Sequence, residues 1–123
     1  MMPKKGQLEM ELSARITQWE KEYLGRGSLT CKADLLRDLA IVTLQGVLTP
    51  AEYELAAKSA GREQLKKYRN NLVESGRAQL EAILHDVLGR RLVSLHTDIS
   101  TKTGERLIVF RLDAPWDGGI DKP

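Results

Sequence analysis

Apolar and polar positions recur with two different periods along the chain, which predicts helices and strands in separate segments. In residues 7–24 the apolar side chains return every three or four positions, as on one face of a helix. Residues 30–45 instead alternate between apolar and polar positions around a two-residue turn, which indicates a first antiparallel hairpin. The register that this turn implies pairs Cys31 with Leu44 on the core face. Cys31 is therefore expected to be a small buried hydrophobe rather than a nucleophile.

A second helical pattern covers residues 50–88 and begins with a capping box formed by Thr49 and Glu52. A break near residues 59–61 divides a short helix from a long one, and one apolar stripe follows the whole length of the long helix. At 1.5 Å per residue this helix would reach ~40 Å, which exceeds the width of a compact domain of this size. We therefore predict that a second copy of the chain covers the stripe and that the protein is a homodimer.

Residues 91–113 are predicted to form a second hairpin whose loop holds Gly104 in a left-handed conformation. A three-residue loop sets His96 opposite Phe110. Both faces of the hairpin then carry apolar residues. One face is expected to pack on the helices and the other on the dimer partner.

These elements give an α+β fold in the order αββααββ. Two antiparallel β-hairpins form a sheet that packs on the N-terminal helix and the long central helix. A chain of 123 residues is long enough for one domain and too short for two. We assign residues 1–113 to this domain and residues 114–123 to a C-terminal tail.

Charge and cysteine content limit the kinds of partner and the cellular compartment that we expect for this protein. The 19 basic and 17 acidic residues leave a net charge of +2, which provides no general attraction for nucleic acid or membrane. One cysteine cannot form an intrachain disulfide, so the fold does not depend on an oxidising compartment. No segment approaches the ~18 consecutive apolar residues that can span a bilayer. We expect a cytoplasmic protein without direct membrane insertion.

Two features could bind phosphate groups. Arg62, Lys66, Arg69 and Arg77 lie on the long helix, and the first three share a face that could contact nucleic acid. Interspersed glutamates favour a solvated face instead, so a nucleic-acid-binding regulator is an alternative and nucleic acid is the less favoured partner. The sequence GRGS at residues 25–28 could cradle a phosphate. It follows a helix rather than preceding one, which favours a helix end and a loop.

The second hairpin contains the most suggestive polar side chains. Ser94, His96 and Asp98 alternate along one strand, but side chains at this spacing project in parallel from Cα atoms ~7 Å apart. A catalytic triad requires hydrogen bonds between its members, so we predict no catalytic residues. The same three side chains, with Lys102 and Arg106, are candidates for a ligand or interaction site. A small-ligand-binding protein or enzyme centred on His96 and Asp98 is a further alternative.

Metal and cofactor sites are not predicted. The chain has two histidines, and no second pair of ligands accompanies either of them. It also lacks the glycine-rich fingerprints of nucleotide-binding loops.

Three segments resemble the MpsC-like family of small bacterial domains: LQGVLTPAE at residues 44–52, ESGRAQLEAIL at 74–84 and VSLHTDISTKTGERLIVF at 93–110. The third is the most specific, since its histidine, its aspartate and its TKTGER loop all match the family pattern. The resemblance extends from about Leu8 to Asp113. The family takes its name from a bacterial system that generates membrane potential by sodium translocation and is linked to uptake of inorganic carbon.

The resemblance implies an accessory role beside the membrane components of such a system, and it transfers no catalytic or ligand residues to this chain. We therefore expect a non-enzymatic, cytosolic interaction or regulatory domain. It would serve a bacterial sodium, membrane-potential or bicarbonate transport system, with a membrane-transport protein as its partner.

Overall fold

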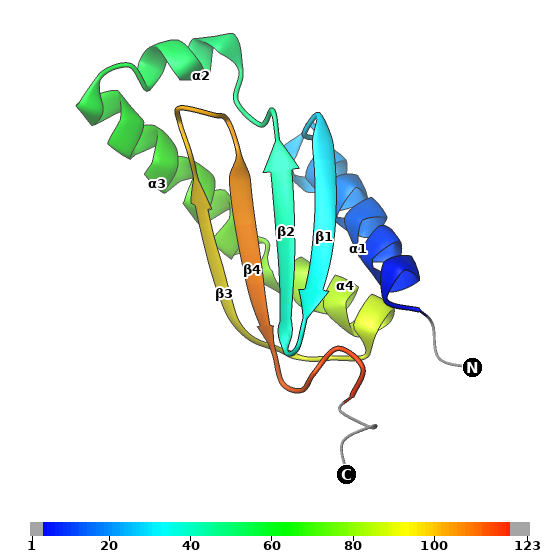
Figure 1. Ribbon diagram of the computed structural model, residues 1–123. Coiled ribbons are helices and arrows are strands. Elements are labelled where there is room, and N and C mark those ends of the chain that lie inside the picture. The colour runs from blue at the N-terminus through cyan, green and yellow to red at the C-terminus, as the bar shows by residue number, and fades with distance from the viewer. Residues whose placement is uncertain (1–3, 119–123) are drawn as a thin grey trace.

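The computed structural model describes residues 4–118 and confirms an α+β domain with one antiparallel sheet (Figure 1). The first helix, α1 (Lys5–Trp19), continues into a π-helical turn, η1 (Glu20–Leu24), and Gly25 ends it with a left-handed φ of 91°. The remaining elements are β1 (Thr30–Leu36), β2 (Leu39–Gln45), α2 (Pro50–Leu55), α3 (Ser59–Ser75), α4 (Arg77–Leu88), β3 (Leu92–Ile99) and β4 (Arg106–Leu112).

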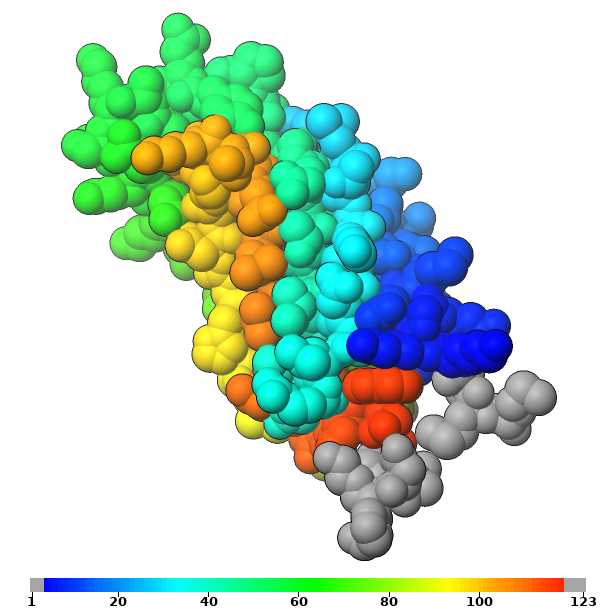
Figure 2. All heavy atoms as spheres, in the orientation of Figure 1, coloured from blue at the N-terminus to red at the C-terminus, as the bar shows by residue number. Residues whose placement is uncertain are grey.

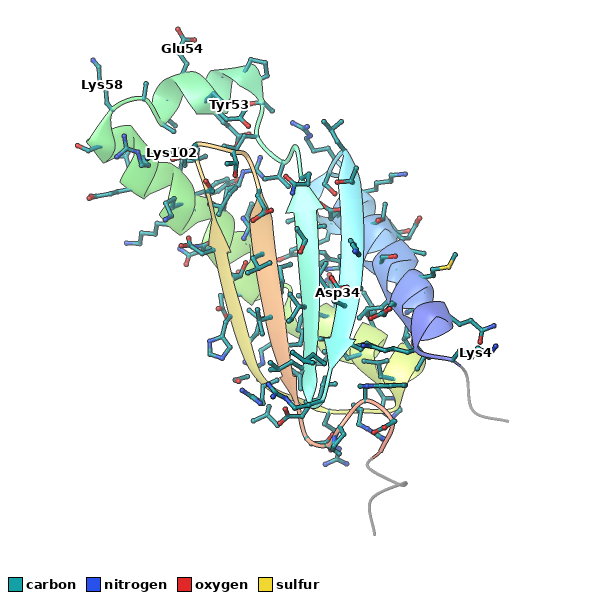
Figure 3. The ribbon with its side chains drawn as sticks, viewed as in Figure 1. Lys4, Asp34, Tyr53, Glu54, Lys58 and Lys102 are labelled. Atoms are coloured by element: carbon teal, nitrogen blue, oxygen red, sulfur yellow. The ribbon has the colours of Figure 1, made fainter. Side chains whose placement is uncertain are left out.

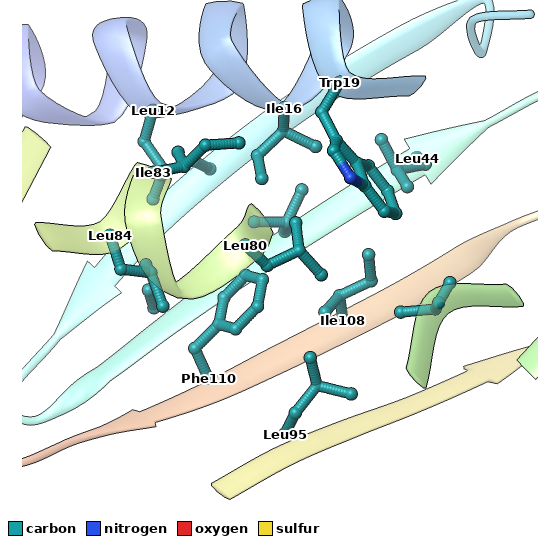
Figure 4. Packing of buried hydrophobic residues seen from close by; sticks show 14 of the residues in the cluster. Leu12, Ile16, Trp19, Leu44, Leu80, Ile83, Leu84, Leu95, Ile108 and Phe110 are labelled. Atoms are coloured by element: carbon teal, nitrogen blue, oxygen red, sulfur yellow. The ribbon is translucent and has the colours of Figure 1, made fainter. Parts of the chain in front are cut away.

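The sheet has the strand order β1-β2-β4-β3, so the two hairpins join through β2 and β4 at its centre. The helices α1, α3 and α4 lie behind one face of the sheet in the view of Figure 1. Apolar side chains from α1, α4 and the strands interlock in this layer, with Phe110 beside Leu80 and Leu84 (Figure 4). Within residues 4–118 no helix covers the opposite face, whose side chains are seen directly in Figure 2. We call this surface the open face.

The long central helix of the sequence prediction is divided at Gly76 into α3 and α4. A Cβ added at Gly76 would lie 2.7 Å from Cζ2 of Trp19 and 3.1 Å from Cε2 of Tyr23. Glycine thus allows the stacked rings of these two residues to pack against the chain. The division lets much of the apolar stripe turn onto the sheet, where Leu65, Leu80, Ile83 and Val87 are buried within one chain. Leu72 is half-buried and Tyr68 is 62% exposed, so packing within one chain accounts for most of the stripe without a second copy.

The first hairpin has the predicted register. Cys31 pairs with Leu44, and Ala33 and Leu35 face the core from the same strand. Cys31 itself is half-buried, and burial raises the pKa of its thiol to about 11. A thiol with so high a pKa is almost entirely protonated at neutral pH, so Cys31 is a weak nucleophile.

The predicted register of the second hairpin is wrong by one residue. His96 pairs with Val109, whereas Leu95 pairs with Phe110. The loop is longer than predicted, because the amide of Ser100 donates to the carbonyl of Glu105 at 2.8 Å and extends the pairing beyond β3. Gly104 nevertheless has the predicted left-handed conformation, with φ 73°.

A shift of one residue moves every side chain of a strand to the other face of the sheet. Ile108 and Phe110 therefore join Leu95 in the buried layer, and the predicted stacking of His96 on Phe110 does not occur. The second hairpin has one apolar face and one mixed face, as expected for an antiparallel sheet with helices on one side.

The described part of the predicted tail, residues 114–118, contacts the domain. The amide of Trp116 donates to the carbonyl of Arg37 at 2.8 Å, and its indole packs against the core. Nε of Arg90 donates to the carbonyl of Pro115 at 2.8 Å. Residues 119–123 of that prediction lie outside the described residues.

Candidate functional site

The candidate residues of the second hairpin are divided between the two faces of the sheet. Ser94 and His96 lie on the open face, with Nε2 of His96 3.1 Å from Oγ of Ser94. Arg106 lies on the covered face and is only 2% exposed. Lys102 is exposed in the hairpin loop (Figure 3). The five candidates therefore do not form one site.

Asp98 projects from the edge strand β3 and contacts α3 rather than His96. It accepts hydrogen bonds from Nζ of Lys66 at 3.2 Å and from Nδ2 of Asn70 at 3.4 Å. Burial alone would raise the pKa of Asp98, but hydrogen bonds from these two side chains and from the amide of Ile99 lower it below its usual value. This contact holds the end of β3 against α3.

Arg106 is buried between β4 and α3. Its Nη1 donates to Oγ1 of Thr97 at 2.9 Å and to Oδ1 of Asn70 at 3.2 Å. Both acceptors are neutral, and Arg106 forms no ion pair within residues 4–118. Burial lowers the pKa of its guanidinium to about 10. Asn70 thus connects Arg106 on the covered face with Asp98 at the sheet edge, although the two charged groups do not touch.

Two further charged residues lie near Arg106. Glu20 of η1 is 2% exposed and accepts a hydrogen bond from Oγ of Ser28 at 3.0 Å. Burial raises the pKa of Glu20 above its ordinary 4.5. Arg69 of α3 binds both carboxylate oxygens of Glu52, at 2.7 and 2.9 Å, and its Nη2 also donates to the carbonyl of Val47 at 3.0 Å.

Glu20, Arg69 and Arg106 line a cavity of about 100 Å³ at one end of the covered layer. We call it the polar cavity. Its lining consists of Glu20, Leu24, Arg26, Gly27, Ser28, Val47, Arg69 and Arg106.

Sequence reasoning found Arg69 and Arg106 separately but missed Glu20 and the cavity itself. Glu20 directly follows the core residue Trp19, and the helical pattern gives no sign that its carboxylate turns inward. The available signal was the GRGS segment at residues 25–28. Its last three residues line the cavity, although the segment follows a helix as the sequence indicated.

The basic residues of the predicted nucleic-acid face each have an acceptor within the same chain. Their partners are as follows: Arg62 with the carbonyl of Ala56, Lys66 with Asp98, Arg69 with Glu52, and Arg77 with Glu81. This bonding leaves less free positive charge for phosphates than the sequence predicted. The structure thus adds no support to the nucleic-acid alternative.

The centre of the open face is more apolar than most of its edges. One row across the sheet runs from Asp34 through Ile41 and Val109 to His96, in the order of the paired strands (Figure 3 labels Asp34). Ile41 and Val109 are half-buried, and Leu107 in the next row is 40% exposed. The centre of the open face is therefore an uncovered apolar strip.

Fold and surface together define a small α+β domain with one helix-covered and one open sheet face. The sequence pattern of the MpsC family, described as a Na⁺-translocating membrane potential-generating system, matches residues 4–114. The chain belongs to this family. No helix within the described part of the chain is both long enough and apolar enough to cross a membrane.

The chain is similar to two proteins of Bacillus subtilis (strain 168). The uncharacterized protein YbcI is 47% identical over 122 residues, which cover 99% of this chain and 98% of the relative. The uncharacterized protein YrhF is 27% identical over 108 residues, which cover 87% and 88% of the two chains. No solved structure gives a significant match.

Proposed function

We propose that the chain is a non-enzymatic accessory protein on the cytoplasmic side of a Na⁺-translocating membrane potential-generating system. It binds a membrane component of that system through the open face of its sheet. Family membership supports the choice of system. The observation that carries the proposed docking surface is the uncovered apolar strip, where Ile41 and Val109 pair side by side on the two central strands.

The layout of the open face supports a protein partner. Protein interfaces combine an apolar centre with a polar rim, and charged residues are depleted at the centre. Here the apolar side chains lie on β2 and β4, while Lys32 and Asp34 on one edge strand and His96 on the other surround them. A sheet face that only contacts water carries mainly polar residues at its outward positions. Ile41 and Val109 depart from that pattern.

A second copy of the chain is the competing occupant of this face. The predicted homodimer stays a prediction, and we propose that such a dimer would form through the open face instead of the long helix. Two sheets packed face to face lie about 10 Å apart with their outward side chains interdigitated, so a dimer would hide the same strip. Light scattering at micromolar concentration distinguishes the occupants. A monomeric mass favours the membrane component.

Affinity purification from detergent-solubilised membranes of the native host tests the proposal. The tagged chain should retain a transport component of the system, identified by mass spectrometry. Ile41→Lys should abolish retention, because it places an uncompensated charge at the centre of the apolar strip. Tyr68→Lys is the matched control, since Tyr68 is 62% exposed but lies on α3.

Circular dichroism establishes that both variants are folded. Loss of the component with Ile41→Lys alone supports the proposal. Retention that is equal in the wild type and in Ile41→Lys, or no retained component at all, would overturn it.

A further inference from the structure

Docking by the open face leaves the polar cavity on the covered side unexplained. Arg106 is buried there with only two neutral oxygens as hydrogen-bond acceptors, both bound through Nη1. A buried charge is ordinarily paired, because removing it from water carries a large desolvation penalty. Glu20 lies close enough to interact electrostatically but forms no ion pair with Arg106 within the described residues. The cavity therefore lacks a direct counter-charge for this guanidinium.

Arg69 adds a second guanidinium to the same cavity. Two hydrogen bonds to Glu52 and one to the carbonyl of Val47 hold its side chain in this conformation. The positive charge of Arg69 lowers the pKa of Arg106, although the carboxylates of Asp98 and Glu20 oppose this effect. Guanidinium groups present several N–H donors in one plane, which suits the oxygens of a carboxylate, carbonate or phosphate.

The size of the cavity permits a ligand larger than one water molecule. Its volume is about 100 Å³, whereas a cavity of ~10–15 Å³ is enough to hold one water molecule. Gly27 and Ser28 also line the cavity, and a cavity of these dimensions holds a small ion rather than a nucleotide. The ligand is therefore a small anion.

Glu20 restricts which anion fits. Its buried carboxylate faces the same cavity and would repel an anion that has only acceptor oxygens. An oxyanion that carries its own hydroxyl can donate that proton to Glu20 while its other oxygens accept from the arginines. We propose that the polar cavity binds a small hydroxyl-bearing oxyanion, with Arg106 and Arg69 as donors and Glu20 as acceptor. Hydrogenphosphate and hydrogencarbonate share this chemistry.

An NMR titration of the full chain with phosphate tests the proposal, with sulfate as the probe that lacks a hydroxyl at neutral pH. Amide signals of Gly27 and Ser28 and the Nε signal of Arg106 should shift with saturation in phosphate. Sulfate at equal ionic strength should bind at least tenfold more weakly. Site-specific shifts are needed, because both salts also stabilise proteins generally by exclusion from the surface.

Two variants connect the shifts to the cavity. Arg106→Met should remove the saturable phosphate response, whereas Arg111→Met should preserve it, since Arg111 pairs with Asp38 at an exposed site. Glu20→Gln should reduce the difference in binding affinity between phosphate and sulfate, because the amide of glutamine can donate a hydrogen bond to a sulfate oxygen. This second variant keeps the test available if Arg106→Met does not fold.

A parallel titration with hydrogencarbonate in a closed cell shows which of the two oxyanions binds more tightly. The anion that saturates at the lower concentration is the better match to the cavity. The proposal is overturned if neither anion saturates, if sulfate matches phosphate in the wild type, or if Arg106→Met responds unchanged. In those cases the polar cavity is not an oxyanion site. None of these outcomes affects docking by the open face, which the purification experiment tests separately.

Discussion

The layer between the helices and the sheet has two ends of opposite character. At one end Leu12, Leu84 and Phe110 are completely buried and surrounded by apolar side chains (Figure 4). At the other end Glu20 and Arg106 are equally buried but enclose the polar cavity. The same strand, β4, contributes to both ends. The contrast teaches that burial alone does not identify what stabilises this fold, because apolar burial is favourable whereas charge burial is not.

Phe110→Ala should have the largest effect on the apolar end. Removing a fully buried aromatic ring is expected to lower the free energy of unfolding by about 3–5 kcal/mol, through lost burial and the cavity left behind. Urea denaturation measures this change. Leu107→Ala, at an outward position on the same strand, should lower it by under about 1 kcal/mol. Similar losses for both variants would contradict the assignment of Phe110 to the main core.

Glu52→Gln tests whether any charges at the polar end stabilise the fold. Glu52 completes the capping box of α2 and binds Arg69 through both oxygens, and the two side chains are 21% and 14% exposed. Partial exposure places the expected loss of stability below that of a fully buried pair, at about 2–3 kcal/mol. Glu81→Gln removes the exposed pair with Arg77 and should lower stability by under about 0.5 kcal/mol.

The pH dependence of the Glu52→Gln effect has a defined sign. Burial alone would raise the pKa of Glu52, but hydrogen bonds from Arg69 and Thr49 outweigh it and lower the pKa below 4.5. The ionised carboxylate therefore stabilises the fold above its unfolded pKa, and this contribution is lost as the pH falls through the folded value. The difference between the wild type and Glu52→Gln should shrink in acid. A constant difference would show that the carboxylate charge is not responsible.

The sequence predicted correctly those features that depend only on neighbouring residues in the chain. Thr49 and Glu52 form the capping box as expected, and the Cys31–Leu44 register follows from alternation around a short turn. One feature of the fold required non-local information. At the division of the long helix, Gly76 leaves room for the rings of Trp19 and Tyr23, and no local pattern reveals that contact.

The candidate site was harder to predict than the fold. Ser100 pairs with Glu105 around a loop one residue longer than predicted, and this changed register places Arg106 on the covered face, away from His96. The polar cavity brings together side chains from η1, α3 and β4, which are far apart in the chain. Sequence periodicity describes one element at a time, so it could not show that Glu20 and Arg106 face each other.

Arg106→Met tests the contrast between the two ends of the layer directly. Its expected effect on the free energy of unfolding has the opposite sign to that of Phe110→Ala. Methionine preserves much of the buried stem and removes the unpaired charge. Without oxyanions in the buffer, the free energy of unfolding should rise by about 1 kcal/mol. Arg106→Lys retains the charge and should show no such rise. A fall of more than about 1 kcal/mol for Arg106→Met would mean that the guanidinium contributes to stability.

Glu20 provides the smallest and most specific test of the polar end. Burial raises its pKa, so the folded protein binds this proton more tightly than the unfolded chain does. Stability attributable to Glu20 should therefore fall as the pH rises from the unfolded value near 4.5 through the raised folded value, and remain lower above it. This sign is opposite to that of Glu52.

Glu20→Gln should consequently gain stability relative to the wild type between acid and neutral pH, as measured by urea denaturation in oxyanion-free buffers. The hydrogen bonds from Ser28 and the charges of Arg69 and Arg106 oppose the effect of burial, which is why the expected change is small. A relative gain that is present in oxyanion-free buffer and altered by phosphate would connect the carboxylate to the ligand. If the relative stability of Glu20→Gln is independent of pH, the Glu20 carboxylate is not penalised by its burial, and the contrast between the two ends rests on Arg106 alone.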